Sequence, residues 1–471
     1  MTKRKYLKDI PFYKMALAIA LPMIGANFVT NFVSMIDNIM IGSLGTNQMN
    51  AVSIINQYIL IFNLTIFGGL SGPSIFGTQF FGRGDYKGQK QTFCYRLILC
   101  LFVTIVAILL FLSLQDILIS LFISSNSDEI MKLETINYAK EYLFIILFSL
   151  LPFSISQAYT TLLRESGETR IPFVGSLSAI GINIIFNYLL IFGKLGFPVL
   201  GVKGAAIATV MAKIFEMVII IVLAHKHSDN NPALDKFYEG FKIQKDLFIE
   251  ISKKSWPLLI NEFLWSLGNG IISQAFSSRG LDVVAARNIF STLTSLFVSV
   301  YAQLGAAAGI ILGQDLGKGD FNKAIQDKDK LLLMAEVISV ILIIISIPLA
   351  FLFPNLYNTT SEIKNMAVWF IIIYGLCTPI FSATNLFYFA LRSGGKTFIT
   401  FLYDFLGVWV VQIPLAIGLC YFTEMNIITV SAIVYVSEII KTIIGYFMVR
   451  SGIWLVKLNR NEETIQDELL D

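Results

Sequence analysis

The sequence predicts an all-α integral membrane protein with twelve transmembrane helices in two parallel-repeat six-helix lobes around a central cavity. Apolar residues make up 55% of the 471 residues and charged residues only 14%, against roughly 25% charged residues in ordinary soluble domains. Apolar runs long enough to cross a hydrocarbon core of ~30 Å recur along the chain. In addition, the second half of the chain repeats motifs of the first half. Together these observations predict the fold class.

The apolar runs define twelve expected membrane spans. Each run holds enough consecutive apolar residues to form a helix that crosses the bilayer core. In chain order, the expected spans are 12–42, 50–80, 93–114, 138–162, 172–193, 204–224, 255–278, 284–313, 331–353, 365–391, 398–421 and 428–450.

The distribution of lysine and arginine predicts the orientation of the spans. Basic residues are concentrated in alternate connections, among them residues 3–8, 83–90, 226–254 and 318–330. The positive-inside rule places such connections in the cytoplasm. We therefore expect a multi-pass protein of the cell (inner) membrane with both termini cytoplasmic, and an even number of spans agrees with this.

Composition argues against several function classes. The net charge is only +3 and no basic stripe is interleaved with aromatic residues, so nucleic-acid binding is not expected. The two histidines, His225 and His227, lie outside the spans, so no catalytic triad or histidine metal site can form within the membrane. Four cysteines without CxxC spacing are expected to pack as thiols: Cys94, Cys100, Cys377 and Cys420. We expect neither an enzyme nor a protein with a cofactor.

The chain contains an internal duplication. "QFFGRGDYKGQ" at 79–89 aligns with "QDLGKGDFNKA" at 314–324, and "LLRESGETR" at 162–170 aligns with "ALRSGGKTF" at 390–398. Because each copy holds an even number of spans, both copies enter the membrane from the same side, as parallel repeats do. The expected division is a lobe at 1–224, a cytoplasmic linker at 225–254, a lobe at 255–451 and a cytoplasmic tail at 452–471.

Polar side chains follow one helical face in the first span and one in the seventh. The first face carries Asn27, Thr30, Asn31, Ser34, Asp37 and Asn38, and the second carries Glu262, Ser266, Asn269, Ser273 and Ser277. Such faces contact protein or water rather than lipid. Helix packing explains the serines and threonines, but an acid costs about 3 kcal/mol at the bilayer centre. The two carboxylates are therefore candidate site residues. For Asp37 a position near the membrane interface remains an alternative, because it follows Phe12 by about 37 Å of helix.

Other charged residues within the spans have simpler interpretations. Lys213 and Glu216 are three residues apart, as are Glu438 and Lys441, so each pair is expected to form a local ion pair. Asp404 and Glu336 are single acids whose depth in the membrane the sequence does not give. They are kept as possible site residues.

Several motifs together resemble one known family. They are "MIDNIMIGSLG" at the end of the first span, the "GRGD" and "GKGD" connections, "LRESGET" and "LRSGGKT", and "GVKGAAIAT" at 201–209. The chain resembles the multidrug and toxic compound extrusion (MATE) family, in its bacterial NorM-like branch. The resemblance implies two six-helix lobes with a central cavity, and export of organic cations in exchange for sodium ions or protons.

The resemblance also implies site residues. Asp37, Asn183, Asn187 and Thr209 correspond to the coupling-ion site of the first lobe, and Glu262 corresponds to the NorM-type acid of the seventh span. Asn269, Asn385 and Asp404 are added as candidate substrate or ion ligands of the second lobe. Two departures bear on the coupling ion. Asn187 stands where many members have an aspartate, and "TPIFSATNLFYF" at 378–389 lacks the acid that some members carry.

The choice of coupling ion rests on ligand chemistry. One carboxylate with several neutral oxygens suits a hard cation, whereas proton coupling favours two neighbouring acids. We therefore expect sodium at Asp37, while Glu262 leaves protons open. A flippase for lipid-linked saccharides is the alternative function, and it would line its cavity with arginines to hold a pyrophosphate. The expected partners are small organic cations, the coupling ion and membrane lipid, without nucleic acid, for a monomer.

Overall fold

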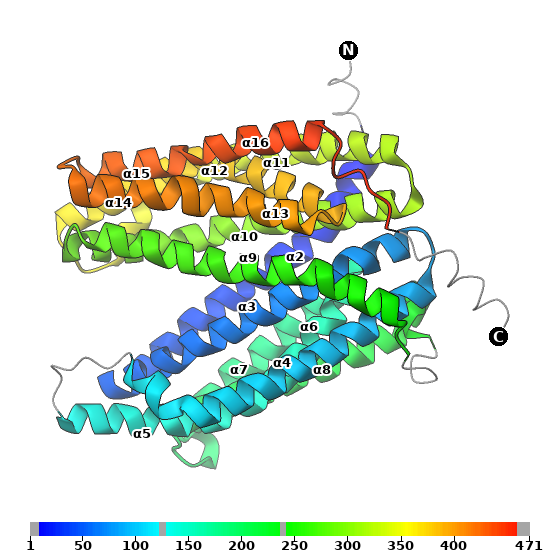
Figure 1. Ribbon diagram of the computed structural model, residues 1–471. Helices are drawn as coiled ribbons and strands as arrows, with labels where there is room; N and C mark the ends of the chain where they lie inside the picture. The colour runs from blue at the N-terminus through cyan, green and yellow to red at the C-terminus, as the bar shows by residue number, and fades with distance from the viewer. Residues whose placement is uncertain (1–8, 122–128, 236–241, 459–471) are drawn as a thin grey trace. The chain divides into compact units, whose positions relative to one another are not determined.

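The protein is built from helices (Figure 1). The computed structural model describes residues 9–121, 129–235 and 242–458. Parts of the expected linker and tail, residues 236–241 and 459–471, lie outside the described residues, as do the first eight residues of the expected cytoplasmic N-terminus.

The first half of the chain forms six long helical segments that match the expected spans in order. These are α2 (Ile10–Gly42), α3 (Thr46–Gly82), α4 (Tyr86–Ser120), α5 (Glu129–Ile146) continued through a 3-10 turn by α6 (Leu150–Glu165), α7 (Arg170–Phe192) and α8 (Val202–Lys226). Most of these helices extend past the apolar runs because a helix does not have to end where the hydrocarbon core ends.

The second half repeats this order. It contains α9 (Lys245–Ser277), α10 (Leu281–Lys318), α11 (Phe321–Leu352), α12 (Ser361–Ser393), α13 (Thr397–Phe405) continued by a π-helical turn (Leu406–Gln412) and α14 (Ile413–Phe422), and α15 (Ile427–Val436) followed by α16 (Glu438–Arg450). Helix α9 begins at Lys245, within the stretch expected to be a linker. Its basic first turns extend the helix beyond the apolar run.

The number of spans agrees with the expected fold class. Within the described residues, eleven helical segments are long and apolar enough to cross a membrane. The expected seventh span, α9, is not among these eleven, because its polar face lowers its hydropathy. It is 33 residues long, which corresponds to about 50 Å at the α-helical rise. An all-α membrane protein is therefore confirmed.

The repeated "GRGD" and "GKGD" motifs have the same backbone geometry. Gly84 and Gly319 both have a φ of 79°, a left-handed conformation that glycine adopts without strain. Gly319 ends α10, and the carboxylate of Asp320 then accepts a hydrogen bond of 2.9 Å from the backbone nitrogen of Lys323. The aspartate thus caps the next helix, which explains why a glycine and an acid follow each other at this helix connection.

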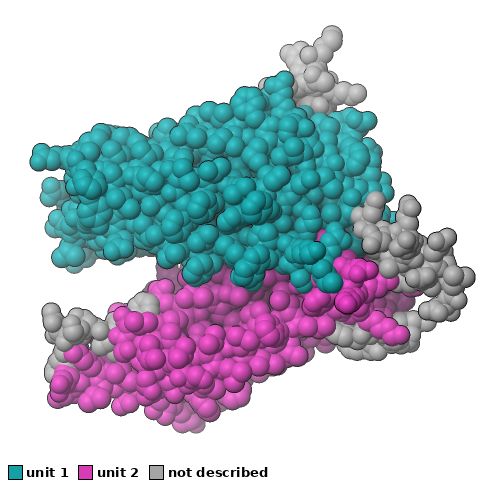
Figure 2. Space-filling view, viewed as in Figure 1, with its two compact units in different colours: residues 1–24, 78–85, 249–471 teal, residues 25–77, 86–248 magenta. Residues whose placement is uncertain are grey.

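Contacts divide the chain into two compact units, coloured in Figure 2. The N-terminal unit comprises residues 25–77 and 86–248, and the C-terminal unit comprises 1–24, 78–85 and 249–471. Within the N-terminal unit, α8 packs against α5, α6 and α7. Within the C-terminal unit, α12 packs against α10, α11, α15 and α16. The lobe boundaries expected at 224 and 255, and a central cavity between lobes, stay predictions.

Residues 78–85 join the C-terminal unit through a buried amide. Gln79 has no exposed surface. Its Nε2 donates to the carbonyl oxygens of Ser393 at 2.8 Å and Val456 at 3.1 Å, and its Oε1 accepts from the nitrogen of Leu458 at 2.8 Å. The end of α3 is thereby bound to the last described residues of the chain.

The cysteines are packed as expected. All four are buried thiols, so the prediction of a packing role is confirmed within the described structure.

Candidate functional site

The Asp37 carboxylate lies against α7. Helix α2 positions Asp37, and the Nδ2 atom of Asn187 donates a hydrogen bond of 2.6 Å to its Oδ1 atom. Asn187 is 1% exposed, so this contact is enclosed by protein. Asn187 also donates to Oδ1 of Asn183 at 3.1 Å, one helical turn earlier on the same face of α7.

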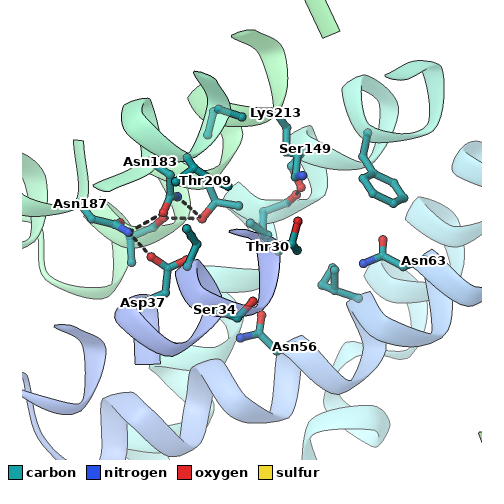
Figure 3. A pocket seen from close by; sticks show the side chains of 18 of the residues that line it. Thr30, Ser34, Asp37, Asn56, Asn63, Ser149, Asn183, Asn187, Thr209 and Lys213 are labelled. Carbon is teal, nitrogen blue, oxygen red and sulfur yellow. Dashed lines mark hydrogen bonds between the residues drawn. The ribbon is translucent and has the colours of Figure 1, made fainter. Parts of the chain in front are cut away.

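Asn183 connects the acid to α8. Its Nδ2 atom donates to Oγ1 of Thr209 at 3.4 Å, and Thr209 in turn donates to the carbonyl of Ala205 at 3.1 Å. When the Asn183 amide is turned so that its nitrogen faces the acid, the nitrogen lies 2.8 Å from Oδ1 and 3.3 Å from Oδ2 of Asp37. The structure therefore brings together Asp37, Asn183, Asn187 and Thr209 from three helices (Figure 3).

This cluster is chemically suited to a small cation. It contains a single carboxylate, and two amides and a hydroxyl that supply neutral oxygens. The Oδ1 atom of Asn187 is buried, and no hydrogen-bond partner for it occurs among the described residues. Hard cations take oxygen ligands of these kinds, and a buried acceptor without a donor is costly unless another group satisfies it.

The cluster lies on the wall of a cavity of about 510 Å³ within the N-terminal unit. The polar face of α2 contributes Thr30, Ser34, Asp37 and Asn38 to the lining. Four of the six residues on the face predicted to avoid lipid therefore line this cavity, and Asn27 and Asn31 are not among its lining residues. Asn56 and Asn63 on α3 and Ser149 before α6 add further polar groups (Figure 3).

Lys213 and Glu216 also line this cavity. The Nζ atom of Lys213 is 2.8 Å from Oε2 of Glu216, so the predicted local ion pair is confirmed. The second predicted pair, on α16, is confirmed as well, with 3.2 Å between Nζ of Lys441 and Oε1 of Glu438.

Asp404 is not the single acid that the sequence suggested. Its Oδ1 atom lies 2.6 Å from Nζ of Lys441, and its Oδ2 atom accepts from Nδ2 of Asn261 at 2.9 Å. The spacing of Glu438 and Lys441 in the sequence predicted only the ion pair within α16. The contact between α13 and α16 depends on how the two helices pack. A role of Asp404 in binding substrate stays a prediction.

Glu262 lies on α9 near three polar side chains. Asp404 was already a candidate from the sequence, whereas Tyr388 and Arg392 were not selected. Glu262 is hydrogen-bonded to Tyr388, and Arg392 and Asp404 are its charged neighbours. The signal for Arg392 was present in the repeated "LRSGG" motif, but its direction toward α9 was not readable. The other two candidates of this unit bond within their own helices. Asn269 donates to the carbonyl of Trp265 at 2.8 Å, and Asn385 donates to that of Phe381 at 3.0 Å.

A sequence profile decides the family. The profile of the MatE family matches residues 22–189 and again residues 257–417, which together are well over half of the chain. The chain belongs to the MatE family. The two matches begin 235 residues apart, the same offset as between the repeated motifs at 79–89 and 314–324, so the MatE profile recognises both repeats.

Curated MatE relatives extend over nearly the whole chain. A protein of Thermotoga maritima named a probable multidrug resistance protein NorM is 23% identical over 458 residues, covering 96% of each chain. The probable multidrug resistance protein YoeA of Bacillus subtilis is 26% identical over 87% of each chain. The resemblance to NorM-like MATE proteins seen in the sequence is therefore confirmed.

Solved structures agree on the MatE fold. A crystal structure of a MATE protein in the bent conformation superposes with a TM-score of 0.83 at 18% identity, covering 96% of this chain and 98% of the other. The bent form of the Vibrio cholerae transporter VcmN gives a TM-score of 0.81 at 16% identity, covering 94% and 97%. At such identities the likeness concerns the fold.

Proposed function

We propose that this MatE protein is a secondary-active exporter of organic, cationic compounds in the inner membrane, driven by an ion that binds at Asp37. The observation that carries the proposal is the convergence of one carboxylate with Asn183, Asn187 and Thr209 on the wall of a cavity of about 510 Å³. The multidrug resistance names of the relatives support the same function. The protein acts as a monomer with both termini in the cytoplasm.

Sodium is the proposed coupling ion. The ligand set around Asp37 offers one negative charge and neutral oxygens, which match a hard monovalent cation. Asn187 supplies an amide where a second acid would favour proton exchange. Each charge that moves inward gains about 2.3 kcal/mol per 100 mV of membrane potential, and this gain can drive export.

The lining of the cavity argues against a flippase for lipid-linked saccharides. Among the described lining residues the charged side chains are Asp37, Lys213 and Glu216. A pyrophosphate is held by several arginines or lysines, and this set carries two acids for one base. An organic cation fits the lining better.

Efflux from proteoliposomes under single imposed gradients tests the proposal. The probe is rhodamine 123, a planar organic cation. We expect a sodium gradient without a pH gradient to drive efflux, and a pH gradient without sodium to drive little. Efflux driven only by the pH gradient would refute sodium coupling, and efflux under neither gradient would refute ion-driven export of this class.

The second acid is expected to contribute to export. Glu262 lies on α9 with Arg392 and Asp404 as charged neighbours, and Glu262→Gln removes its acidic group while keeping the size of the side chain. We expect efflux of rhodamine 123 to fall about tenfold, because an acid within a span can exchange charge with a cation. Proteoliposomes with equal amounts of folded protein measure the rate. An unchanged rate would show that Glu262 has no part in transport.

A further inference from the structure

Lys213 presents its ammonium group to the cavity of the N-terminal unit. It follows Thr209 by one turn of α8, so the two side chains lie on the same helical face, and both line the cavity (Figure 3). Its partner Glu216 is enclosed, and the Oγ atom of Ser176 donates a hydrogen bond of 2.9 Å to Oε1 of Glu216. The exposed fraction of the side chain is 31% for Lys213 and 6% for Glu216. Both residues line the cavity, and the ammonium side chain of Lys213 is the more exposed half of the ion pair.

The equivalent lysine of the second repeat binds two carboxylates. An offset of 228 residues relates Lys213 to Lys441. The Nζ atom of Lys441 lies 2.6 Å from Asp404 and 3.2 Å from Glu438, and the side chain is only 9% exposed. One lysine in this protein thus shows how two acids share an ammonium group, which has three donors.

The first repeat has a serine in place of the second acid. The offset of 228 that relates the two lysines also relates Ser176 to Asp404. The hydroxyl of Ser176 bonds Glu216 and brings no charge. Lys213 therefore has one carboxylate partner among the described residues, where its repeat equivalent has two.

We propose that Lys213 binds an acidic group of the transported compound as a second carboxylate partner beside Glu216, so that it has two partners as Lys441 has in the other repeat. The cavity then favours amphoteric compounds, in which a basic nitrogen is attracted by Asp37 and a carboxylate binds Lys213. This inference rests on the proposed export function and narrows its substrate class. Lys213 is a specificity-determining residue, and Glu216 and Ser176 position it.

The energetic basis is a charge-assisted hydrogen bond. Ammonium–carboxylate bonds are short and roughly twice as strong as neutral ones, and a partly enclosed wall strengthens them relative to water. The ring of Phe153, with its centre 5.4 Å from Nζ of Lys213, provides an apolar surface beside the ammonium for a planar compound. An ester of the same compound keeps its shape but cannot form the charged bond.

A matched pair of dyes tests the inference. Rhodamine 110 carries a carboxylic acid, and rhodamine 123 is its methyl ester with the same planar cation. Fluorescence anisotropy with the purified full-length protein in detergent gives both dissociation constants. We expect the acid to bind about tenfold more tightly than the ester, a ratio that corresponds to ~1.4 kcal/mol.

Three variants and one control assign this preference to Lys213. Lys213→Gln combined with Glu216→Gln removes both charges without leaving a buried acid unpaired, and we expect the ratio to fall to about one. Ser176→Asp supplies the second acid of the other repeat, so it should occupy Lys213 and also abolish the preference. Lys213→Arg should keep the preference. Lys203→Gln is the control, because Lys203 lies on the same helix in an exposed pair with Glu141.

The outcomes separate this inference from the proposed function. Equal binding of acid and ester by the wild-type protein would overturn the role of Lys213 and leave export of cations standing. A preference that survives in both the double variant and Ser176→Asp would also overturn it. Binding of neither dye would refute the proposed function itself.

Discussion

Asp37→Asn is expected to abolish sodium-driven efflux while the protein still folds and inserts. The substitution removes the only charge from the cluster with Asn183, Asn187 and Thr209, and it keeps an oxygen that can accept the 2.6 Å hydrogen bond from Asn187. Without the charge, sodium affinity should fall about a hundredfold, which corresponds to ~2.7 kcal/mol. Efflux of rhodamine 123 from proteoliposomes under a sodium gradient measures the loss.

The control for this variant is Asp116→Asn in the same unit. Asp116 lies on α4 with 72% of its side chain exposed, 2.5 Å from Nζ of Lys140, so its removal should leave efflux unchanged. Should Asp37→Asn transport at the wild-type rate under a sodium gradient, Asp37 has no part in coupling.

Arg96→Met is expected to destabilise the protein strongly. Arg96 on α4 and Glu165 at the end of α6 form an ion pair in which neither side chain is exposed. Arg96 also donates to the carbonyl of Pro73 on α3 at 3.1 Å. Gly77 on α3 lies against both charged groups, so a side chain at this position would collide with them. The variant leaves Glu165 buried without its counter-charge, which typically costs about 3–5 kcal/mol.

Thermal unfolding in detergent, followed by size-exclusion chromatography, measures this loss. The matched control is the double variant Arg96→Met with Glu165→Leu, because replacing both partners by apolar residues leaves no buried charge. We expect the double variant to unfold at a higher temperature than Arg96→Met alone. Equal stability of Arg96→Met and the wild type would show that the pair does not hold α3, α4 and α6 together.

The sequence by itself determined the features that depend on neighbours along the chain. Span length follows from continuous apolar runs, so the order of helices from α2 to α16 was predictable. The ion pairs Lys213–Glu216 and Lys441–Glu438 followed from a spacing of three residues on a helix. The match of the MatE profile to both halves agrees with the duplication read from the repeated motifs.

Part of the candidate site was also readable. The polar face of α2 followed from helical periodicity, and the four-residue spacing of Asn183 and Asn187 predicted a shared face of α7. The convergence of these residues with Asp37 and Thr209 came from the family resemblance. The tertiary structure supplied the hydrogen bonds that join them.

Only the tertiary structure decided the contacts between distant segments. Asp404 and Lys441 meet because α13 packs beside α16, and Gln79 reaches residues more than 300 positions later. Helical periodicity gives the face on which a side chain lies, but which other helix covers that face depends on packing over the whole unit. For this reason no partner on another helix could be predicted for Asp404 or Arg96. The contrast between the enclosed Lys441 and the more exposed Lys213 became visible only in the folded protein.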